Sequence, residues 1–290
     1  MNLYWWNEIP NVGDSASRYL ISRLSSDSIV WKMPHFTILG GTKRMIKKLI
    51  REKQLDLSIK GYVFPWEKCI FGIGSILDYS NSKTIVWGSG FREEYSKFNG
   101  GEILSVRGKL SANKLKRIGY LENIPIGDPA LLLPLVYNPC RKKQGGIKLV
   151  PHFMEYDEIF KEYGSRYDVI DIRTDDVESF IDQIIDSDYI LSTSLHGIII
   201  AHAYGIPALW IKKGYIASSG FKFYDYFSSV GIELYDGYDN IQEILSSKET
   251  VVKLFEENVP KSHINVSLCE IQSELLRVAP FKTDRMVKYV

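Results

Sequence analysis

STSLHG, residues 192–197, is a polar stretch between two apolar segments. The apolar run at residues 189–191 has the length of a buried strand, and residues 197–204 have the length of a helix that Gly205 and Pro207 would end. In a parallel sheet, the loop between a strand and the next helix lies at the carboxyl end of the strand, where ligands bind. We therefore expect this loop to be a binding site.

The segments on either side extend the pattern. Residues 177–185 carry apolar side chains at helical spacing, which predicts an amphipathic helix. Residues 208–211 form a further apolar run of strand length. Helix, strand, loop, helix and strand in this order contain a βαβ unit, which indicates an α/β fold with a parallel sheet.

The loop offers three hydroxyls and the imidazole of His196 at the start of a helix. Free N–H groups and the positive end of the helix dipole favour an anion there, and histidine exchanges protons near neutral pH. A structural interpretation stays open, in which the hydroxyls cap the helix and the imidazole is buried. His202 lies off the face of His196, and we expect it in the core.

The composition is that of an ordinary globular protein. The 290 residues are 45% hydrophobic and 24% charged, enough for one large or two average domains. A net charge of +1 argues against nucleic acid as a partner. The amino terminus lacks the pattern of a signal peptide, and the scattered Cys69, Cys140 and Cys269 lack metal-ligand spacing. We expect a cytoplasmic protein with reduced thiols and no bound metal.

The chain begins with the same alternation. An apolar strand at residues 3–6 precedes the turn NVGD at residues 11–14, and a helix is expected at residues 15–24. Asp14 could act as a base, bind an acceptor hydroxyl, or cap that helix. Apolar strands at residues 69–73 and 84–87 are each followed by a glycine-serine turn, in which glycine lets a ligand approach the backbone.

Arg107 follows a strand expected at residues 102–106, at a position where its planar guanidinium can bind a carboxylate or phosphate. The alternative is a structural ion pair. A helix is expected from residue 109 to residue 118. Residues 134–146 are rich in proline, glycine and polar side chains, as in a linker. We therefore divide the chain into residues 1–138 and 139–290.

Strand and helix alternate again after the linker. His152 follows a strand at residues 147–150, as His196 follows its own strand, so the two imidazoles could converge. Lys222 opens an aromatic segment and either binds an anion or is solvated. We expect two Rossmann-like domains facing across a cleft. The basic segment at residues 43–53 predicts an amphipathic helix, which lies on the protein surface or on an anionic membrane.

Several short motifs together resemble the polysaccharide pyruvyl transferase family, most closely its ketal-pyruvate branch. The motifs are NVGD at 11–14, GSG at 88–90, SVRG at 105–108, GDP at 127–129, PHF at 151–153, residues 192–210, and FKFYDY at 221–226. They span residues 2–230. The resemblance implies a fold similar to that of the two-domain, B-type (GT-B) glycosyltransferases.

The resemblance also implies an activity. Members transfer the enolpyruvyl group of phosphoenolpyruvate to two hydroxyls of one sugar, forming a cyclic ketal, without a further cofactor. The acceptor would be a polysaccharide or its lipid-linked oligosaccharide precursor, which makes peripheral membrane contact plausible. His196 matches the family's functional histidine and Arg107 a donor-binding arginine. Many members carry arginine where this chain has Ser194, which leaves Arg107, Lys222 and the loop hydroxyls to bind the donor.

We accordingly expect three groups of site residues. The catalytic residues are His196, Asp14 and His152. The donor-binding residues are Arg107, Ser192, Ser194, Leu195, Gly197 and Lys222. The acceptor or loop contacts are Asn11, Gly13, Gly74, Ser75 and Ser89.

Two other classes of protein stay open. A glycosyltransferase that uses a nucleotide-sugar could have the same fold, although no ribose-binding acid stands at the usual distance from a glycine-rich loop. A glycan-binding protein without activity would also use the many aromatic side chains, 18 tyrosines and 6 tryptophans among them.

Overall fold

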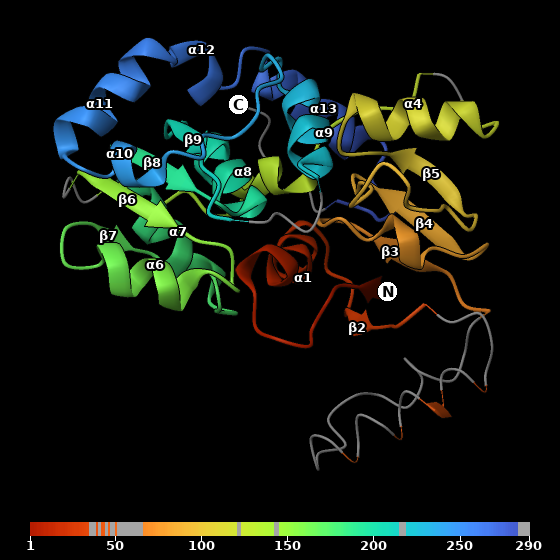
Figure 1. Ribbon diagram of the computed structural model, residues 1–290. Helices are drawn as coiled ribbons and strands as arrows, with labels where there is room; N and C mark the ends of the chain where they lie inside the picture. The colour runs from red at the N-terminus through yellow and green to blue at the C-terminus, as the bar shows by residue number, and fades with distance from the viewer. Residues whose placement is uncertain are drawn as a thin grey trace.

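The computed structural model describes residues 1–34, 66–120, 123–141, 145–214 and 219–283, together with positions 39, 42, 43, 46 and 50. It is a mixed α/β structure with two parallel sheets, one in each half of the chain (Figure 1). The predicted α/β class with parallel sheets is therefore confirmed. Most of the basic segment at residues 43–53 lies outside the described residues.

The first sheet has five parallel strands in the order β2-β1-β3-β4-β5. Their bounds are β1 (Asn2–Tyr4), β2 (Val30–Trp31), β3 (Cys69–Phe71), β4 (Thr84–Trp87) and β5 (Glu102–Ser105). β1 pairs with β2 on one side and with β3 on the other, with Leu3 opposite Trp31 and Ile70. The strand order therefore reverses direction beside β1, which is where open parallel sheets bind ligands.

The second sheet repeats this arrangement with four parallel strands in the order β7-β6-β8-β9. Its strands are β6 (Ile147–Val150), β7 (Asp168–Val169), β8 (Tyr189–Ser192) and β9 (Ala208–Trp210). β6 lies between β7 and β8, with Val150 opposite Ser192. The order reverses beside β6, so each half has one such reversal point.

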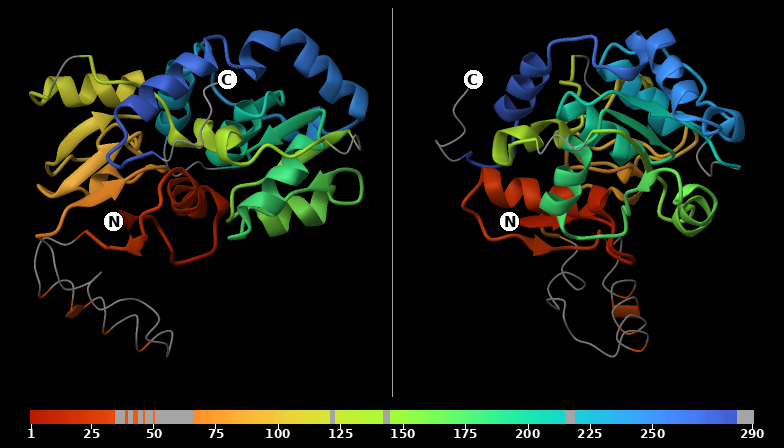
Figure 2. Two further views of the ribbon diagram at one scale, coloured as in Figure 1. Left: turned by 180° about the vertical axis from the view of Figure 1, so that it is seen from behind. Right: turned by 90° about the vertical axis from the view of Figure 1, so that its left-hand side faces the viewer.

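Helices connect the strands and pack on the sheets (Figures 1 and 2). In the first half they are α1 (Val12–Leu24), η1 (Leu77–Tyr79), α4 (Lys109–Arg117), η2 (Pro129–Leu132) and α5 (Leu133–Val136). In the second half they are α6 (Tyr156–Tyr163), α7 (Val177–Ile185), α8 (Leu195–Ala203), α9 (Phe221–Ser229), α10 (Ile241–Ile244), α11 (Lys248–Glu257), α12 (Val259–Ser262) and α13 (Leu268–Arg277). Among the described helices, none has the length and apolar run that crossing a membrane requires.

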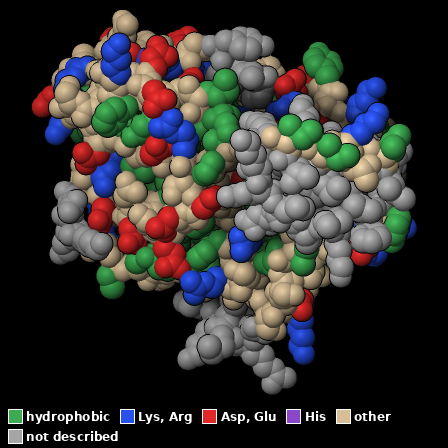
Figure 3. Space-filling model, turned by 90° about the horizontal axis from the view of Figure 1, so that it is seen from below, with side chains coloured by type: hydrophobic (Ala, Val, Ile, Leu, Met, Phe, Trp, Pro, Cys, Tyr) green, Lys and Arg blue, Asp and Glu red, His purple; other side chains and the backbone are tan. Residues whose placement is uncertain are grey.

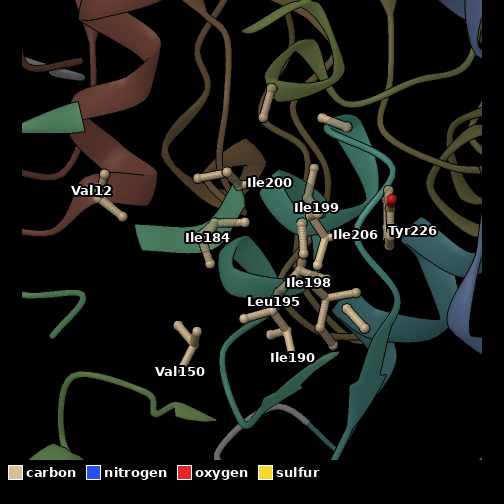
Figure 4. Close-up of a cluster of buried hydrophobic side chains, with 14 of the residues drawn as sticks. Val12, Val150, Ile184, Ile190, Leu195, Ile198, Ile199, Ile200, Ile206 and Tyr226 are labelled. Carbon is tan, nitrogen blue, oxygen red and sulfur yellow. The ribbon is translucent and has the colours of Figure 1, made fainter. Parts of the chain in front are cut away.

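One hydrophobic cluster runs through both halves. Val12 on α1 lies in the same cluster as Leu195 and Ile198 on α8 (Figure 4). A second cluster covers the opposite face of the first sheet and contains Phe71 and Val106. Apolar burial thus fixes the position of α1 between the two sheets, since it is the main driving force for packing.

Polar contacts also join the halves. The backbone N–H of Val12 donates to Ile172 O at 3.0 Å. Near the end of the described chain, α13 packs against η2, and Trp87 Nε1 donates to Leu275 O at 2.9 Å. The second half therefore completes the core of the first. The domain boundary at residues 138 and 139 and the likeness to GT-B enzymes stay predictions.

Two helices begin earlier than the sequence pattern predicts. α1 starts at Val12 because the side chain of Asn11 caps it, accepting from Gly13 N at 3.0 Å. The alternative in which Asp14 is the cap is therefore wrong, since Asp14 lies in the first turn. α8 starts at Leu195, so His196 is a helical residue and does not lie in a preceding loop.

The described part of the face seen from below mixes acidic and basic side chains (Figure 3). No large patch of one sign is drawn there.

Candidate active site

The two reversal points meet at one place. The segments that leave β1 and β3 in the first half carry Asp14 and Gly74, and those that leave β6 and β8 in the second carry His152 and His196. A Cβ added to Gly74 would lie 3.9 Å from Asp14 Oδ1. The carboxyl ends of both sheets therefore contribute to the same site.

Gly13 of the first half and His196 of the second half lie in close contact at this site. A Cβ added to Gly13 would lie only 1.9 Å from His196 Nδ1, a distance no side chain can adopt. The imidazole therefore rests directly on the backbone of the first turn of α1. Glycine is required at this position by space alone.

Asp14 follows Gly13 and is partly exposed. Burial raises the pKa of its carboxyl to about 7, while the nearby charge of Lys222 and a hydrogen bond from the Trp6 backbone act against this rise. A carboxyl with this pKa exchanges protons at neutral pH, as a general acid or base must.

His196 and His152 have the opposite shift. Burial lowers the pKa of His196 to about 3, and the positive charges of Lys222 and Arg107 lower it further. Burial and Lys222 likewise lower the pKa of His152 to about 4. Both imidazoles are therefore neutral at pH 7. Because an anion favours the charged form of a neighbouring imidazole, a bound anion would raise both pKa values.

Lys222 is the cation that these groups share. Burial lowers the pKa of its ammonium to about 8, and Arg107 adds to the shift, while Glu155 and Asp14 oppose it. Lys222 lies in the first turn of α9, with its Nζ 5.4 Å from the centre of the Phe223 ring. It forms no ion pair with any residue that the structure describes, and its charge shifts the pKa values of Asp14, His152 and His196.

Arg107 is fully buried and has protein partners on every side. Its Nε and Nη2 lie 3.0 and 2.9 Å from Asp225 Oδ2, and Nη2 also donates to Phe91 O at 2.7 Å. Nη1 donates to Ser75 Oγ at 2.5 Å. Arg107 thus forms the structural ion pair that the sequence left open, and its charge reaches the site through its effect on Lys222 and His196.

The hydroxyl residues at the end of β8 are all buried. Ser192 is fully buried, and its Oγ is within 2.7 Å of Val150 O and 2.8 Å of Ser194 O. Ser194 occupies the N-cap position of α8 without a side-chain cap bond. Leu195 belongs to the core. Gly197 gives room to Ser192 and Val150, since an added Cβ would approach them to 2.5 and 2.7 Å.

The turns of the first half are packed against one another. Ser89 Oγ donates to Gly74 O at 2.8 Å and is fully buried. Ser75 is partly exposed and accepts from Arg107. Gly90 gives way to the Arg107 guanidinium, which an added Cβ would approach to 2.5 Å. These turns position Arg107, and Gly74 remains the residue next to Asp14.

Three further residues at the site have partners that the sequence does not reveal. Thr193 Oγ1 accepts from His152 N at 2.8 Å and donates to Glu155, which ties the two strand ends together. Burial raises the pKa of Glu155, against the hydrogen bond from Thr193 and the charge of Lys222. Asp225 binds Arg107 and the N–H and hydroxyl of Ser111. Their partners come from distant segments, which a single sequence does not pair.

The site therefore combines two neutral imidazoles, a carboxyl whose pKa is near 7, and a cation that has no ion pair among the described residues. The starts of three helices, α1, α8 and α9, contribute to it. Helix starts and cations attract a small anion. The imidazoles and the carboxyl can move protons to and from it. His202, by contrast, is buried between Tyr226 Oη and Ala208 O, as expected of a core residue.

Comparisons with known proteins show the family of the chain. Residues 8–212 match the family model described as polysaccharide pyruvyl transferase. The chain is also 33% identical, over 173 residues, to an uncharacterised protein of Acanthamoeba polyphaga mimivirus, which covers 56% of this chain and 60% of that protein. The matched segment thus spans less than two thirds of that relative. No solved structure matches the chain.

Proposed function

The chain belongs to the polysaccharide pyruvyl transferase family, and from this premise we propose that it transfers the enolpyruvyl group of phosphoenolpyruvate to two hydroxyls of one sugar. The product would be a cyclic pyruvate ketal on a polysaccharide or its lipid-linked precursor. The observation that carries the proposal is Lys222, which has no ion pair among the described residues and acts electrostatically on two neutral imidazoles. We further propose that the two halves correspond to the two Rossmann-like domains of GT-B enzymes.

The donor fits the charges of the site. Phosphoenolpyruvate is small and carries a carboxylate and a phosphate, so cations and helix starts recognise it without a nucleotide pocket. Lys222 would bind one of these groups directly. Arg107 would attract the donor by its charge without contacting it, because its guanidinium already donates to Asp225, Phe91 and Ser75.

Donor binding would also prepare the acid. In the free protein His196 is neutral, and the negative charge of the donor would offset Lys222 and Arg107, raising the pKa of the imidazole. The protonated His196 would then deliver its proton to the methylene carbon C3 of the donor. The carbon C2 would become electrophilic, and His152 would serve as a second proton carrier.

Asp14 would act on the acceptor. Its carboxylate accepts the proton of the first sugar hydroxyl while that oxygen forms a bond to C2. The bond between C2 and the phosphate oxygen then breaks, and inorganic phosphate leaves. The second hydroxyl attacks the same carbon and closes the ketal. One hydroxyl proton replaces the proton that His196 gave to C3, and the other leaves with the phosphate as HPO₄²⁻.

Thermal unfolding of the purified chain with phosphoenolpyruvate, UDP-sugars, CMP-sialic acid or phosphate alone tests the donor. A ligand bound to the native state raises the midpoint by mass action. We expect a shift with phosphoenolpyruvate that Lys222→Ala abolishes and that the control Lys161→Ala, an exposed lysine on α6, keeps. A shift with a nucleotide-sugar and none with phosphoenolpyruvate would replace pyruvyl transfer with glycosyl transfer.

Turnover separates acid from binding. With an acceptor in hand, His196→Gln should lower kcat by about 100-fold to 10,000-fold, the usual contribution of a general acid, while the phosphoenolpyruvate midpoint shift persists. Near-normal turnover in His196→Gln would show that this imidazole is not the acid.

A further inference from the structure

A large cavity lies beside the charged site but does not include its charged residues. Its volume is about 860 Å³, within the range of roughly 300–1,000 Å³ typical of small-molecule sites. The described part of its lining comes from the end of β1, the outer face of α1, the segment at β2 and the loop before α7.

The described lining is aromatic with a few polar groups. Trp5, Trp6, Trp31 and Tyr19 supply rings, and Arg18 and Asp175 are the charged residues among the described positions that line it. An aromatic face with a polar rim suits the C–H face and the hydroxyls of a sugar ring. A single arginine opposed by an aspartate does not suit a multiply charged donor.

The walls are held in place before any ligand arrives. Trp31 Nε1 donates to Trp5 O at 3.0 Å, and Trp31 is only 8% exposed. Tyr19 Oη donates to Glu178 at 2.7 Å. A site built from fixed side chains loses little conformational entropy on binding, which strengthens affinity.

Two residues connect this cavity to the charged site. The backbone of Trp6 hydrogen bonds to the carboxyl of Asp14, and the Trp6 ring lies 5.6 Å from that of Phe153, next to His152. Ser15 follows Asp14 in α1, and its Oγ donates to Asp175. A ligand in the cavity thus lies next to the segment that carries Asp14.

We propose that this cavity, which we call the aromatic groove, binds the acceptor saccharide, with a sugar ring stacked on Trp5 or Trp6 and hydroxyls bound by Arg18 and Asp175. The inference rests on the proposed function, because it gives the donor to the charged site and the acceptor to the groove. Asp14 lies between them, where a hydroxyl of the acceptor meets C2 of the donor.

Arg18 is the sharpest point to test. It is exposed on α1 and forms no ion pair with any residue that the structure describes, so its removal leaves the fold intact. Arg117, exposed on α4 far along the chain, is a matched control. Trp6→Ala tests the stacking surface, and Tyr95→Ala removes an aromatic ring, 89% exposed, that does not line the groove.

The experiment titrates the purified full chain with lactose, cellobiose, mannobiose and diacetylchitobiose, following tryptophan fluorescence and saturation-transfer NMR. We expect at least one disaccharide to bind, with a Kd about tenfold weaker in Arg18→Ala and in Trp6→Ala and unchanged in Arg117→Ala and Tyr95→Ala. Midpoint shifts with phosphoenolpyruvate should be the same in wild type and Arg18→Ala.

The outcomes separate the two proposals. If phosphoenolpyruvate stabilises the chain and no disaccharide binds, or binding ignores both Arg18→Ala and Trp6→Ala, the groove is not the acceptor site and the donor assignment stands. If disaccharides bind through Arg18 and Trp6 but phosphoenolpyruvate has no effect, the groove is a saccharide site and the proposed transfer is wrong. If Lys222→Ala weakens disaccharide binding as much as Arg18→Ala does, the division into two sites is overturned.

Discussion

Two sets of charges lie where the halves of the molecule meet, and they differ in how those charges are satisfied. Arg107 and Asp225 are both fully buried, and hydrogen bonds from Ser111 and to Phe91 and Ser75 complete the pair. The other set is the open cluster of Asp14, His152, His196 and Lys222, which is partly exposed. Its charges influence one another without direct ion pairs among the described residues.

The two sets of charges have different roles, since the buried pair stabilises the fold and the open cluster is available to bind a ligand. A buried charge without a partner is costly, so the Arg107 pair can persist only as a complete unit, and it fixes α9 against the first half. The open cluster keeps its capacity for a ligand, and the cost of that capacity is visible in its shifted pKa values. Stability and activity therefore depend on neighbouring but different residues.

The largest expected effect comes from breaking the buried ion pair of Arg107 and Asp225, which we call the closed pair. Arg107→Ala leaves Asp225 buried and unpaired and should lower the free energy of unfolding by about 3–5 kcal/mol. Urea unfolding at pH 7 measures this. Lys222→Ala removes a cation that burial already disfavours, so its unfolding midpoint should match or exceed that of wild type. Equal losses in both variants would abolish the distinction between the two sets.

A smaller effect of opposite sign is expected for Asp14→Asn. The folded pKa of about 7 lies above the ordinary value of 3.8, so wild type loses stability as pH rises from about 4 to about 7. Asp14→Asn removes this loss and should be more stable at pH 8 by on the order of 1–2 kcal/mol, a value reduced by the partial exposure of the carboxyl. The gain should vanish below pH 4.

Unfolding at pH 8 and pH 4 measures that difference, and the same samples test activity. Asp14→Asn should keep the midpoint shift with phosphoenolpyruvate and lose transfer. If the variant were less stable than wild type at pH 8, the charged carboxylate of Asp14 would have stabilising partners in the folded protein. Asp14 would then be a structural residue, like Arg107 and Asp225.

The smallest effect is expected for an exposed ion pair between the two halves. Arg23 and Glu178 also join the two halves, with an Nη2 to Oε1 distance of 2.7 Å, but their side chains are 54% and 38% exposed. Arg23→Ala should cost at most about 1 kcal/mol in low salt and less in high salt. A loss of stability as large as that of Arg107→Ala would show that the contribution of the closed pair comes from joining the two halves and not from its burial.

Much of the fold could be predicted because local patterns agree with it. The α7 helix, residues 177–185, and the β4 strand, residues 84–87, have the predicted bounds, since their apolar spacing and length decide them. Helix starts were less predictable. Asn11 and Asp14 are both good caps, and only the backbone geometry selects Asn11, which shifts Asp14 into the first turn.

The sequence predicts which residues belong to the candidate site better than it predicts which of them contact one another. His152, His196 and Asp14 each follow a strand, and topology brings the ends of those strands together. No pattern in one sequence pairs Arg107 with Asp225, which is 118 residues away. The same limit hid Glu155, whose partner Thr193 lies on another strand end, and the groove beside Asp14, whose walls come from four separate segments.

The packing of α13 on the first half determines when that half can finish folding during synthesis. Trp87 donates to Leu275, and Gln272 donates to Leu131, so the core around β4 and η2 lacks its cover until the ribosome has passed residue 276. During synthesis the first half must wait, with apolar surface exposed, for most of the chain to emerge. Chaperone dependence should therefore be highest before α13 leaves the ribosomal tunnel.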